Sequence, residues 1–366
     1  MKKIGIITLY DDINIGNKLQ NYAVQTYFEK LGFDCKTIPH WEMAHKKRDF
    51  WLCIYTIIKY IGFPKRISKK LRLLDKRKKS IKRFSNEHLK LAECIKINKI
   101  PKDFNKQYDY FVVGSDQVWH NWTNSVSELS YFFLAFAERN QRLTISPSFG
   151  KNSIEKEFLE DYIKGVKGFE ILTCREEQGK DLIKSITGID STVLLDPTML
   201  INTSEWFKIE RKPLFFPDNY ILVYALGNCR DEIQNYIQKI SLEYGWEIVD
   251  IHNYENETLF LTAPDEFIYY IHHAKVVITD SFHACVFSVL FNTNFIVFDR
   301  DTTGMGNMSS RLDTLLNTFN LNDRKYISGI DPFGADFTLV QNILKTEREK
   351  AEKLYNETFI LLNSIR

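Results

Sequence analysis

The chain has 366 residues and a mass of 43.2 kDa, and 44% of its residues are hydrophobic, 14% aromatic and 26% charged. This length and composition exclude a disordered, collagen-like or coiled-coil chain and allow about two globular domains. A net charge of +2 argues against a general nucleic-acid binder. The six cysteines are widely spaced without a CxxC pair, so we expect no disulfide scaffold or zinc cluster and place the protein in the reducing cytoplasm.

The N-terminal half alternates predicted strands and helices. KKIGIITLY reads as a buried strand, KLQNYAVQTYFEKLGF as a helix that ends at Gly32, and DCKTIPHW as a second strand. This is the β-loop-α-β unit of a parallel sheet. Further strands are expected at 109–116, 142–150, 170–174 and 191–198.

Positive charge is concentrated in one segment. Residues 59–83 hold twelve lysines and arginines against one acid, Asp75, a local charge of +11 that leaves −9 for the rest of the chain. A mostly apolar run at 51–63 precedes most of these charges. One interpretation is a solvated helix face; the other is attachment to an anionic membrane surface, where each basic residue adds on the order of 1 kcal/mol. Nucleic acid is the least favoured partner.

The C-terminal half repeats the alternation after a predicted linker at 202–219, which contains Pro213 and Pro217. Strands are expected at 220–228, 246–251, 275–280 and 295–299, and helices at 231–245, 264–274 and 281–292. We therefore predict an α/β fold with two Rossmann-like domains facing each other across a cleft. The domains are 1–205 with a basic insert at 51–100, then 206–335, followed by a C-terminal helix at 336–366.

Polar residues follow several predicted strands at their carboxyl ends, where open parallel sheets bind ligands. In the first domain they are Asn17, Lys18, Gln20, Ser115, Asp116, Arg175 and Glu176. A helix N-terminus favours an anion, and a guanidinium pairs with carboxylate or phosphate. Each group also has a structural interpretation as a cap, a turn or an ion pair.

The sharpest pattern is TDSFHA at 279–284, which ends a strand and opens an apolar helix. Asp280 or Ser281 can cap this helix, and His283 falls in its first turn, where its proton can move near neutral pH. Ser310 and Arg311 follow the last strand of the same domain. His272 and His273 are predicted to be surface or packing residues, and with His283 they lack a fourth ligand, so we expect no metal site.

These segments, in this order, resemble the polysaccharide pyruvyl transferase family, whose members have a glycosyltransferase B-like fold. The strings that carry the resemblance are GIITLY, IGNKLQNYAVQ, YDYFVVGSDQVW, SFG at 148–150, CREEQG, VLLDPT, EFIYYIHHAKVVITDSFHACVF and SSRLDTLL, spread over about residues 4–316. Lys18 and Ala284 stand where the family often has arginine and glycine, respectively.

The resemblance implies transfer of a pyruvyl group from phosphoenolpyruvate to a sugar of a cell-surface polysaccharide or its lipid-linked precursor. The product is a cyclic ketal, phosphate is released, and neither metal nor cofactor is needed. Phosphoenolpyruvate is an anion, so Lys18, Arg175 and Arg311 are the expected clamps. A proton must reach its methylene carbon and two sugar hydroxyls must each lose one, which suits His283 with Glu176 or Asp116 as a partner carboxylate. The other substrate-binding candidates are Asn17, Gln20, Ser115, Asp280, Ser281 and Ser310.

Two alternatives stay open at this point. The first is a nucleotide-sugar glycosyltransferase of the same shape, in which Asp299 or Asp301 binds the ribose. The second is an inactive member of the family that binds an oligosaccharide or a partner protein. In each case we expect a cytoplasmic protein, held at the inner face of the cytoplasmic membrane if residues 51–83 bind anionic lipid.

Overall fold

The computed structural model describes residues 1–41, 65–300 and 309–364. The apolar run at 51–63 and Asp301 lie outside the described residues. The chain divides into two compact units, Met1–Pro197 with Glu357–Arg366, and Thr198–Asn356. Each unit contains a four-stranded sheet in which every strand pairing is parallel. The predicted α/β class with two Rossmann-like units is therefore confirmed.

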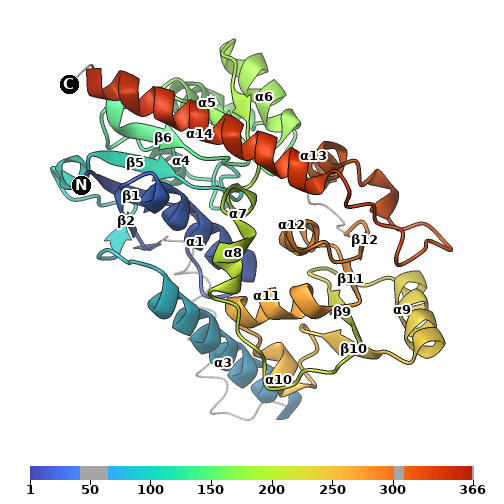
Figure 1. The fold of residues 1–366 in the computed structure, drawn as a ribbon. Coiled ribbons are helices and arrows are strands. Elements are labelled where there is room, and N and C mark those ends of the chain that lie inside the picture. The colour runs from blue at the N-terminus through green and yellow to red at the C-terminus, as the bar shows by residue number, and fades with distance from the viewer. Residues whose placement is uncertain (42–64, 301–308, 365–366) are drawn as a thin grey trace. The chain divides into compact units, whose positions relative to one another are not determined.

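The sheet of the first unit has the strand order β2-β1-β5-β6 (Figure 1). Its two central strands are almost wholly buried and apolar, as expected of parallel strands covered on both faces. Gly5 lets this sheet pack closely, because a Cβ there would lie 2.7 Å from Ile38 Cδ1 and 2.9 Å from Phe111 Cδ1. Two small parallel pairs, β3 with β4 and β7 with β8, extend the unit.

The strands of the first unit are β1 (Lys3–Ile7), β2 (Asp34–Thr37), β3 (His40–Trp41), β4 (Ile95–Lys96), β5 (Tyr110–Val113), β6 (Arg142–Thr144), β7 (Thr173–Cys174) and β8 (Thr192–Val193). Its helices are α1 (Ile15–Lys30), α3 (Lys65–His88), α4 (Val126–Phe132), α5 (Leu159–Val166) and α6 (Glu177–Thr187), and α7 (Pro197–Leu200) begins at the unit boundary. The helix predicted to stop at Gly32 does so, and Gly32 takes the left-handed φ of 89° that glycine favours.

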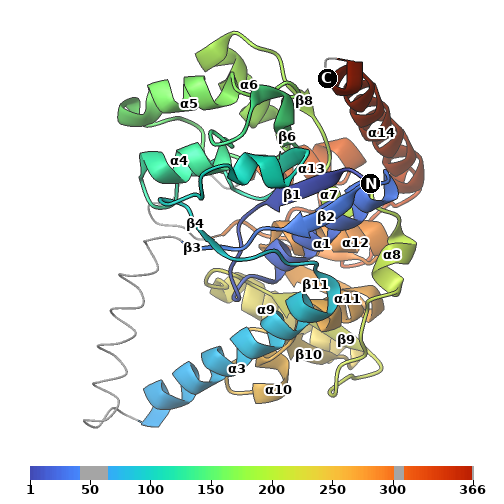
Figure 2. The same ribbon diagram turned by 90° about the vertical axis from the view of Figure 1, so that its left-hand side faces the viewer.

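Residues 65–83 of the basic segment lie in one continuous helix, α3 (Figure 2). Leu73, Arg77, Ile81 and Phe84 form a buried stripe at helical spacing. The Phe84 ring lies 6.4 Å from the Tyr22 ring of α1. Arg72, Lys76, Lys79 and Lys82 are exposed, so the helix combines a packed face with a cationic face.

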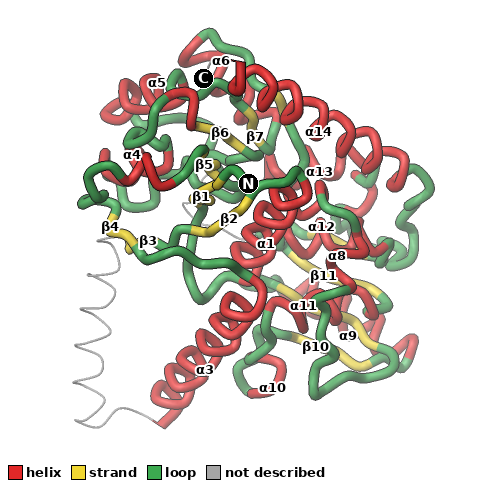
Figure 3. The backbone as a smooth tube through the Cα atoms, turned by 60° about the vertical axis from the view of Figure 1, so that its left-hand side comes forward, coloured by secondary structure: helices red, strands yellow, loops and turns green. Residues whose placement is uncertain are grey.

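The sheet of the second unit has the order β10-β9-β11-β12. Its elements are α8 (Thr203–Phe207), β9 (Tyr220–Tyr224), α9 (Asp231–Tyr244), β10 (Glu247–Asp250), α10 (Glu257–Phe260), α11 (Pro264–His273), β11 (Val276–Thr279), α12 (Phe282–Phe291), β12 (Phe295–Val297), α13 (Ser309–Phe319) and α14 (Val340–Ser364). The predicted linker at 202–219 thus contains the short helix α8. Residues of α14, continuous in Figure 3, belong to both units by their contacts, and Phe359 packs 4.4 Å from Phe33.

Strand order places a switch point in each sheet. In the first unit the next strand along the chain, β2, lies on one side of β1, and β5 lies on its other side. In the second unit β10 lies on one side of β9, and β11 lies on its other side. Ligands of open α/β sheets bind at the carboxyl ends of the strands on either side of such a point. Among the described residues, no helix is long and apolar enough to cross a membrane.

Candidate active site

A chain of side-chain hydrogen bonds links the elements at the switch point of the first unit. Gln20 Nε2 donates to Thr8 Oγ1 at 2.6 Å, and Thr8 Oγ1 donates to the carbonyl oxygen of Ser115 at 3.0 Å. This chain ties α1 to the ends of β1 and β5. Asn17, beside it in the sequence, donates to Asp11 Oδ2 at 3.0 Å. The structure therefore brings Asn17, Gln20 and Ser115 to one edge of the sheet, where they were predicted.

Lys18 is a buried cation with little compensation. Its side chain is 1% exposed, and its Nζ lies 3.2 Å from Asp12 Oδ1 and 3.5 Å from the centroid of the Tyr10 ring. Burial lowers the pKa of Lys18, and the attraction of Asp12 offsets only part of this effect. An anion bound next to the ammonium would stabilise its charged form, which is what a phosphate or carboxylate clamp needs.

Arg175 is the centre of a buried polar cluster at the ends of β5 and β7. Its Nη1 donates to Asp196 Oδ2 at 2.8 Å and to Ser115 Oγ at 3.3 Å, and the Ser115 hydroxyl donates to the same Asp196 oxygen at 2.8 Å. Asp116 Oδ1 lies 3.8 Å from Nη2, and Glu176 Oε2 lies 3.9 Å from Nε. Three carboxyl groups thus surround one guanidinium.

The pKa of Arg175 records this balance. Burial alone disfavours the charged guanidinium, but the attraction of Asp196, Asp116 and Glu176 outweighs it and raises the pKa above the usual value. Arg175 is 3% exposed, and its guanidinium already pairs with carboxylates of the same unit. The geometry therefore favours a positioning role for Arg175, since its charge is already compensated within the unit. Cys174 next to it is an inert thiol, because burial raises its pKa to about 12.

The backbone is strained beside this cluster. Asp116 and Ser146, just beyond β5 and β6, have positive φ angles of 75° and 51°, and both residues are buried. Ser146 Oγ donates to the carbonyl oxygen of Leu195 at 2.7 Å, and Asp116 Oδ1 accepts the backbone N–H of Gln117 at 2.9 Å. Left-handed residues other than glycine concentrate at functional sites, where surrounding contacts hold them in place.

Glu176 is fixed by a neighbouring loop. Its Oε1 accepts from Ser148 Oγ at 2.8 Å and from the backbone N–H of Phe149 at 3.2 Å. The loop after β6 thereby orients the Glu176 carboxylate. Asp196 and Ser148 bind candidate site residues but were not selected in the sequence analysis, although they lie inside the VLLDPT and SFG strings.

In the second unit Asp280 joins three strand ends. Its Oδ1 accepts from the backbone N–H of Leu226 at 2.7 Å, and its Oδ2 accepts from Gly227 N at 2.8 Å and from Arg300 Nε at 3.0 Å. Gly227 permits this approach, because a Cβ there would lie 2.7 Å from Arg300 Cγ. Asp280 was predicted to bind substrate; its carboxylate is occupied by these three bonds, which hold the ends of β9 and β11 together.

His283 lies in the first turn of α12, beyond the end of β11, and is 8% exposed. Ser281, predicted as a cap, is the N-cap: its Oγ accepts from Ala284 N at 3.5 Å. The Arg311 guanidinium, from α13, lies over the Phe282 ring with its carbon 5.8 Å from the centroid, and the rings of Phe282 and His283 are 5.4 Å apart. The structure thus gathers Asp280, Ser281, His283 and Arg311 around the start of α12, with Ser310 next to Arg311.

The predicted acid–base residue and its predicted partners belong to different units. His283 is in the second, whereas Asp116 and Glu176 are in the first. Asp299, the alternative ribose ligand, lines a small pocket of about 40 Å³ in the second unit with Arg230, Asp313, Lys325 and Tyr326.

Two parallel sheets with buried, titratable side chains at their carboxyl edges define an α/β protein with a candidate site at the strand ends. The sequence places it more narrowly. Residues 14–302 match the family described as polysaccharide pyruvyl transferase, and the chain therefore belongs to that family. Membership makes it a transferase of polysaccharide biosynthesis. The match includes His283 and the whole Arg175 cluster, whereas Arg311 lies beyond it.

Solved structures resemble this chain at low identity. UDP-GlcNAc 2-epimerase from Neisseria meningitidis, bound to UDP-GlcNAc, is 12% identical over 98% of this chain and 94% of that chain, with a TM-score of 0.44. A putative UDP-N-acetylglucosamine 2-epimerase from Listeria monocytogenes is 12% identical over 94% of each chain, with a TM-score of 0.46. MurG from Acinetobacter baumannii is 8% identical over 94% of this chain and 90% of that chain, with a TM-score of 0.39. No curated protein matches the chain.

Removing the Asp196 carboxylate tests whether the Arg175 cluster holds the site together. We expect Asp196→Ala to lower the free energy of unfolding by roughly 3 kcal/mol, because a buried guanidinium loses an ion pair and Ser115 loses its acceptor. Asp190→Ala, which breaks the exposed pair with Lys184 at 2.8 Å, is the matched control and should change stability little. Urea unfolding measures both variants, and equal stabilities would contradict a structural role for the cluster.

Proposed function

We propose that this protein transfers a pyruvyl group from phosphoenolpyruvate to two hydroxyls of one sugar, which forms a cyclic ketal and releases phosphate. The observation that carries this proposal is the family match, which extends over most of the chain and includes the candidate residues from Asn17 to His283. The acceptor is a sugar of a cell-surface polysaccharide or of its lipid-linked precursor. Such a sugar must present two hydroxyls close enough for a ring of five or six atoms.

The chemistry needs a group that both gives and takes protons. A proton adds to the methylene carbon of phosphoenolpyruvate, and the electron-poor C2 that results takes up the first sugar hydroxyl, which gives up its proton. The C2–O bond to phosphate then breaks with its electron pair on phosphate, and the second hydroxyl adds to C2 and loses its proton. We assign this proton transfer to His283, because imidazole is the side chain most often used as a general acid–base and this one stands at a helix N-terminus.

The donor also needs cationic groups for its phosphate and carboxylate. We assign these contacts to Lys18 and Arg311, with the backbone N–H groups at the start of α1 and α12 as further donors. Asp116 and Glu176 fit the other substrate, because carboxylate oxygens accept hydrogen bonds from sugar hydroxyls. Arg175 would orient both carboxylates in this scheme.

Ligand-induced stabilisation tests the donor. Phosphoenolpyruvate should raise the Tm, because a ligand that binds only the native state stabilises it, and UDP should not. Lys18→Met and Arg311→Met preserve side-chain volume and should each weaken phosphoenolpyruvate binding by roughly 1.5–3 kcal/mol in calorimetry, the range for a hydrogen bond to a charged group. Lys90→Met, at an exposed lysine paired with Glu29, is the control. Stabilisation by UDP alone would instead favour the nucleotide-sugar glycosyltransferase.

Substitution of His283 tests the proton transfer. His283→Ala should fold, still bind phosphoenolpyruvate, and lose turnover by a factor of about 10² to 10⁴, the usual contribution of a general acid–base. The assay is phosphate release with a panel of hexosides whose hydroxyl pairs differ in spacing. His283→Gln keeps an N–H donor but cannot transfer a proton. An active Gln variant would make His283 a ligand of the phosphate, and an active Ala variant would remove it from the reaction.

We also propose that α3 attaches the enzyme to an anionic membrane surface, where a lipid-linked acceptor would lie. The support is the local charge of +11 over residues 59–83 and the exposure of Arg72, Lys76, Lys79 and Lys82 on one helix. Arg77 belongs to the buried stripe of the same helix and is 5% exposed, so a test must leave it in place.

Charge reversal on the exposed face tests the membrane contact. Lys76→Glu, Lys79→Glu and Lys82→Glu together should reduce binding to phosphatidylglycerol-containing vesicles by at least about tenfold, since each basic residue near such a surface contributes on the order of 1 kcal/mol. Wild-type binding should also be lost near about 0.5 M salt, where charges are screened. Reversal of the exposed Lys345, Lys350 and Lys353 of α14 changes the net charge equally and is the control. Equal binding by both triple variants would rule out α3 as the anchor.

A further inference from the structure

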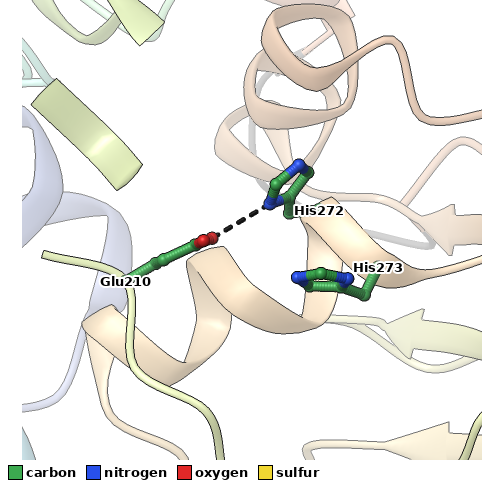
Figure 4. Close-up of side chains that lie close together, drawn as sticks. All are labelled: Glu210, His272 and His273. Carbon is green, nitrogen blue, oxygen red and sulfur yellow. Dashed lines mark hydrogen bonds and ion pairs between the residues drawn. The ribbon is translucent and has the colours of Figure 1, made fainter. Parts of the chain in front are cut away.

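Three side chains with metal-ligating atoms converge in the second unit. Glu210 follows α8, and His272 and His273 end α11. The Nδ1 of His272 lies 3.0 Å from Glu210 Oε2, and Figure 4 shows the His273 ring beside this pair. One ligand atom from each residue lies within 4.8 Å of the other two. The sequence did not predict this grouping, because its carboxylate comes from the segment taken as a linker.

The distances fit a small divalent ion. Zinc ligands lie about 2.0–2.2 Å from the metal, so two ligands of a tetrahedral ion are roughly 3.3 Å apart. The 3.0 Å between Glu210 and His272 is close to that value. His273 ends the helix and is exposed, and one of its ring nitrogens already lies within 4.8 Å of the ligand atoms of the pair.

The backbone that carries Glu210 is held in place before any ion binds. Glu210 N donates to the carbonyl oxygen of Trp206 at 2.9 Å. The next residue, Arg211, donates from its backbone N–H to Asp265 O at 3.1 Å and pairs through Nε with Asp265 Oδ2 at 2.9 Å. Asp265 is fully buried at the start of α11. Glu210 is thus fixed against the helix whose other end carries the two histidines.

Aromatic rings hold the imidazoles. The His272 ring stacks 4.7 Å from Phe207 and lies 5.0 Å from Phe291, and the His273 ring lies 4.2 Å from Tyr269. Apolar surroundings of this kind orient the ligands of a metal site and limit the access of water. Both histidines also lie in the last turn of α11, where the helix dipole favours a cation.

We propose that Glu210, His272 and His273 bind a divalent transition-metal ion, with Zn²⁺ the best match, which fastens the segment after α8 to the end of α11. Imidazole nitrogens and one carboxylate select zinc, copper, nickel or cobalt over magnesium and calcium, which prefer oxygen ligands. Three protein ligands leave a coordination position for water. The ion has no part in the transfer chemistry proposed above, so either proposal can fail without the other.

Protonation governs the affinity. In the metal-free hydrogen bond His272 Nδ1 donates to Glu210 Oε2. A metal bound at Nδ1 displaces that proton, and a neutral ring then carries its single proton on Nε2. Burial, His272 and Lys212 lower the pKa of His273, and Glu210 opposes this lowering. Lys212 is the nearby positive charge that opposes the ion. Binding releases protons, so affinity should fall as the pH drops below about 6.

The experiment uses the full chain without a histidine tag, freed of metal by a chelator. Calorimetry with Zn²⁺ should give one site per chain, and Zn²⁺ should raise the Tm by several degrees. Co²⁺ in place of Zn²⁺ should give visible absorption bands of a site with nitrogen and oxygen ligands. Glu210→Gln, His272→Gln and His273→Gln should each weaken Zn²⁺ binding at least tenfold, whereas His120→Gln, at a half-buried histidine whose ring lies 3.9 Å from that of Trp122, should not.

Each outcome decides the proposal. If wild type and the Glu210→Gln variant bind Zn²⁺ alike, the His272–Glu210 contact is only a hydrogen bond and the metal site is wrong. Loss of binding in His272→Gln but not in His273→Gln would likewise overturn the three-ligand site. His273→Gln changes an exposed side chain, so its circular dichroism should match wild type and a failure to bind cannot be ascribed to unfolding.

Discussion

The buried guanidinium of Arg175 is the constraint on which the carboxyl edge of the first unit depends. A charge that is 3% exposed is tolerated only when paired and hydrogen-bonded, and Asp196 supplies the bond of 2.8 Å. Satisfying Arg175 draws together the ends of β5, β7 and β8, because Ser115, Arg175 and Asp196 follow these three strands. Asp116, whose φ is positive, lies beside the same guanidinium. The electrostatics of one side chain therefore sets the geometry of the predicted site.

In the second unit the strand ends are also joined by one buried charged group, but its charge is negative. There the buried group is the Asp280 carboxylate, and its partners are the N–H groups of Leu226 and Gly227 and the side chain of Arg300. In both units a buried polar side chain links the ends of neighbouring strands beyond the point where the backbone hydrogen bonds of the sheet stop. These hydrogen bonds fix the loops at each switch point. The first turn of α12, which carries His283, therefore follows a loop that is held in place.

Periodicity predicted most of the fold because each sheet is built from short apolar strands that alternate with helices. Asp34–Thr37 and Val276–Thr279 follow from such patterns directly. The short helix α8 was missed, since Pro213 and Pro217 made its surroundings read as a linker and five residues give too little periodicity.

Site residues divide in the same way. The sequence selected Arg175, Asp116, Glu176 and Asp280, but it did not select two of their partners. Asp196 stands before a proline at the end of a predicted strand, and Arg300 follows the last strand. Which polar groups pair depends on strand order, and the order β2-β1-β5-β6 is not written in any one segment. Glu210 and His272 are 62 residues apart in the sequence, so no single segment shows their contact.

Two buried cations of the first unit show how compensation separates structure from function. Arg175 has three carboxyl groups around it, and its pKa is raised despite burial. Lys18 has Asp12, itself 34% exposed, and the face of Tyr10, and its pKa is lowered because burial prevails. A bound anion would add little to a guanidinium whose charge is already balanced, but it would relieve the desolvation of the ammonium. By this argument Lys18 is the better candidate for an anion ligand, and the role we expect of Arg175 is to hold its three carboxylates in place.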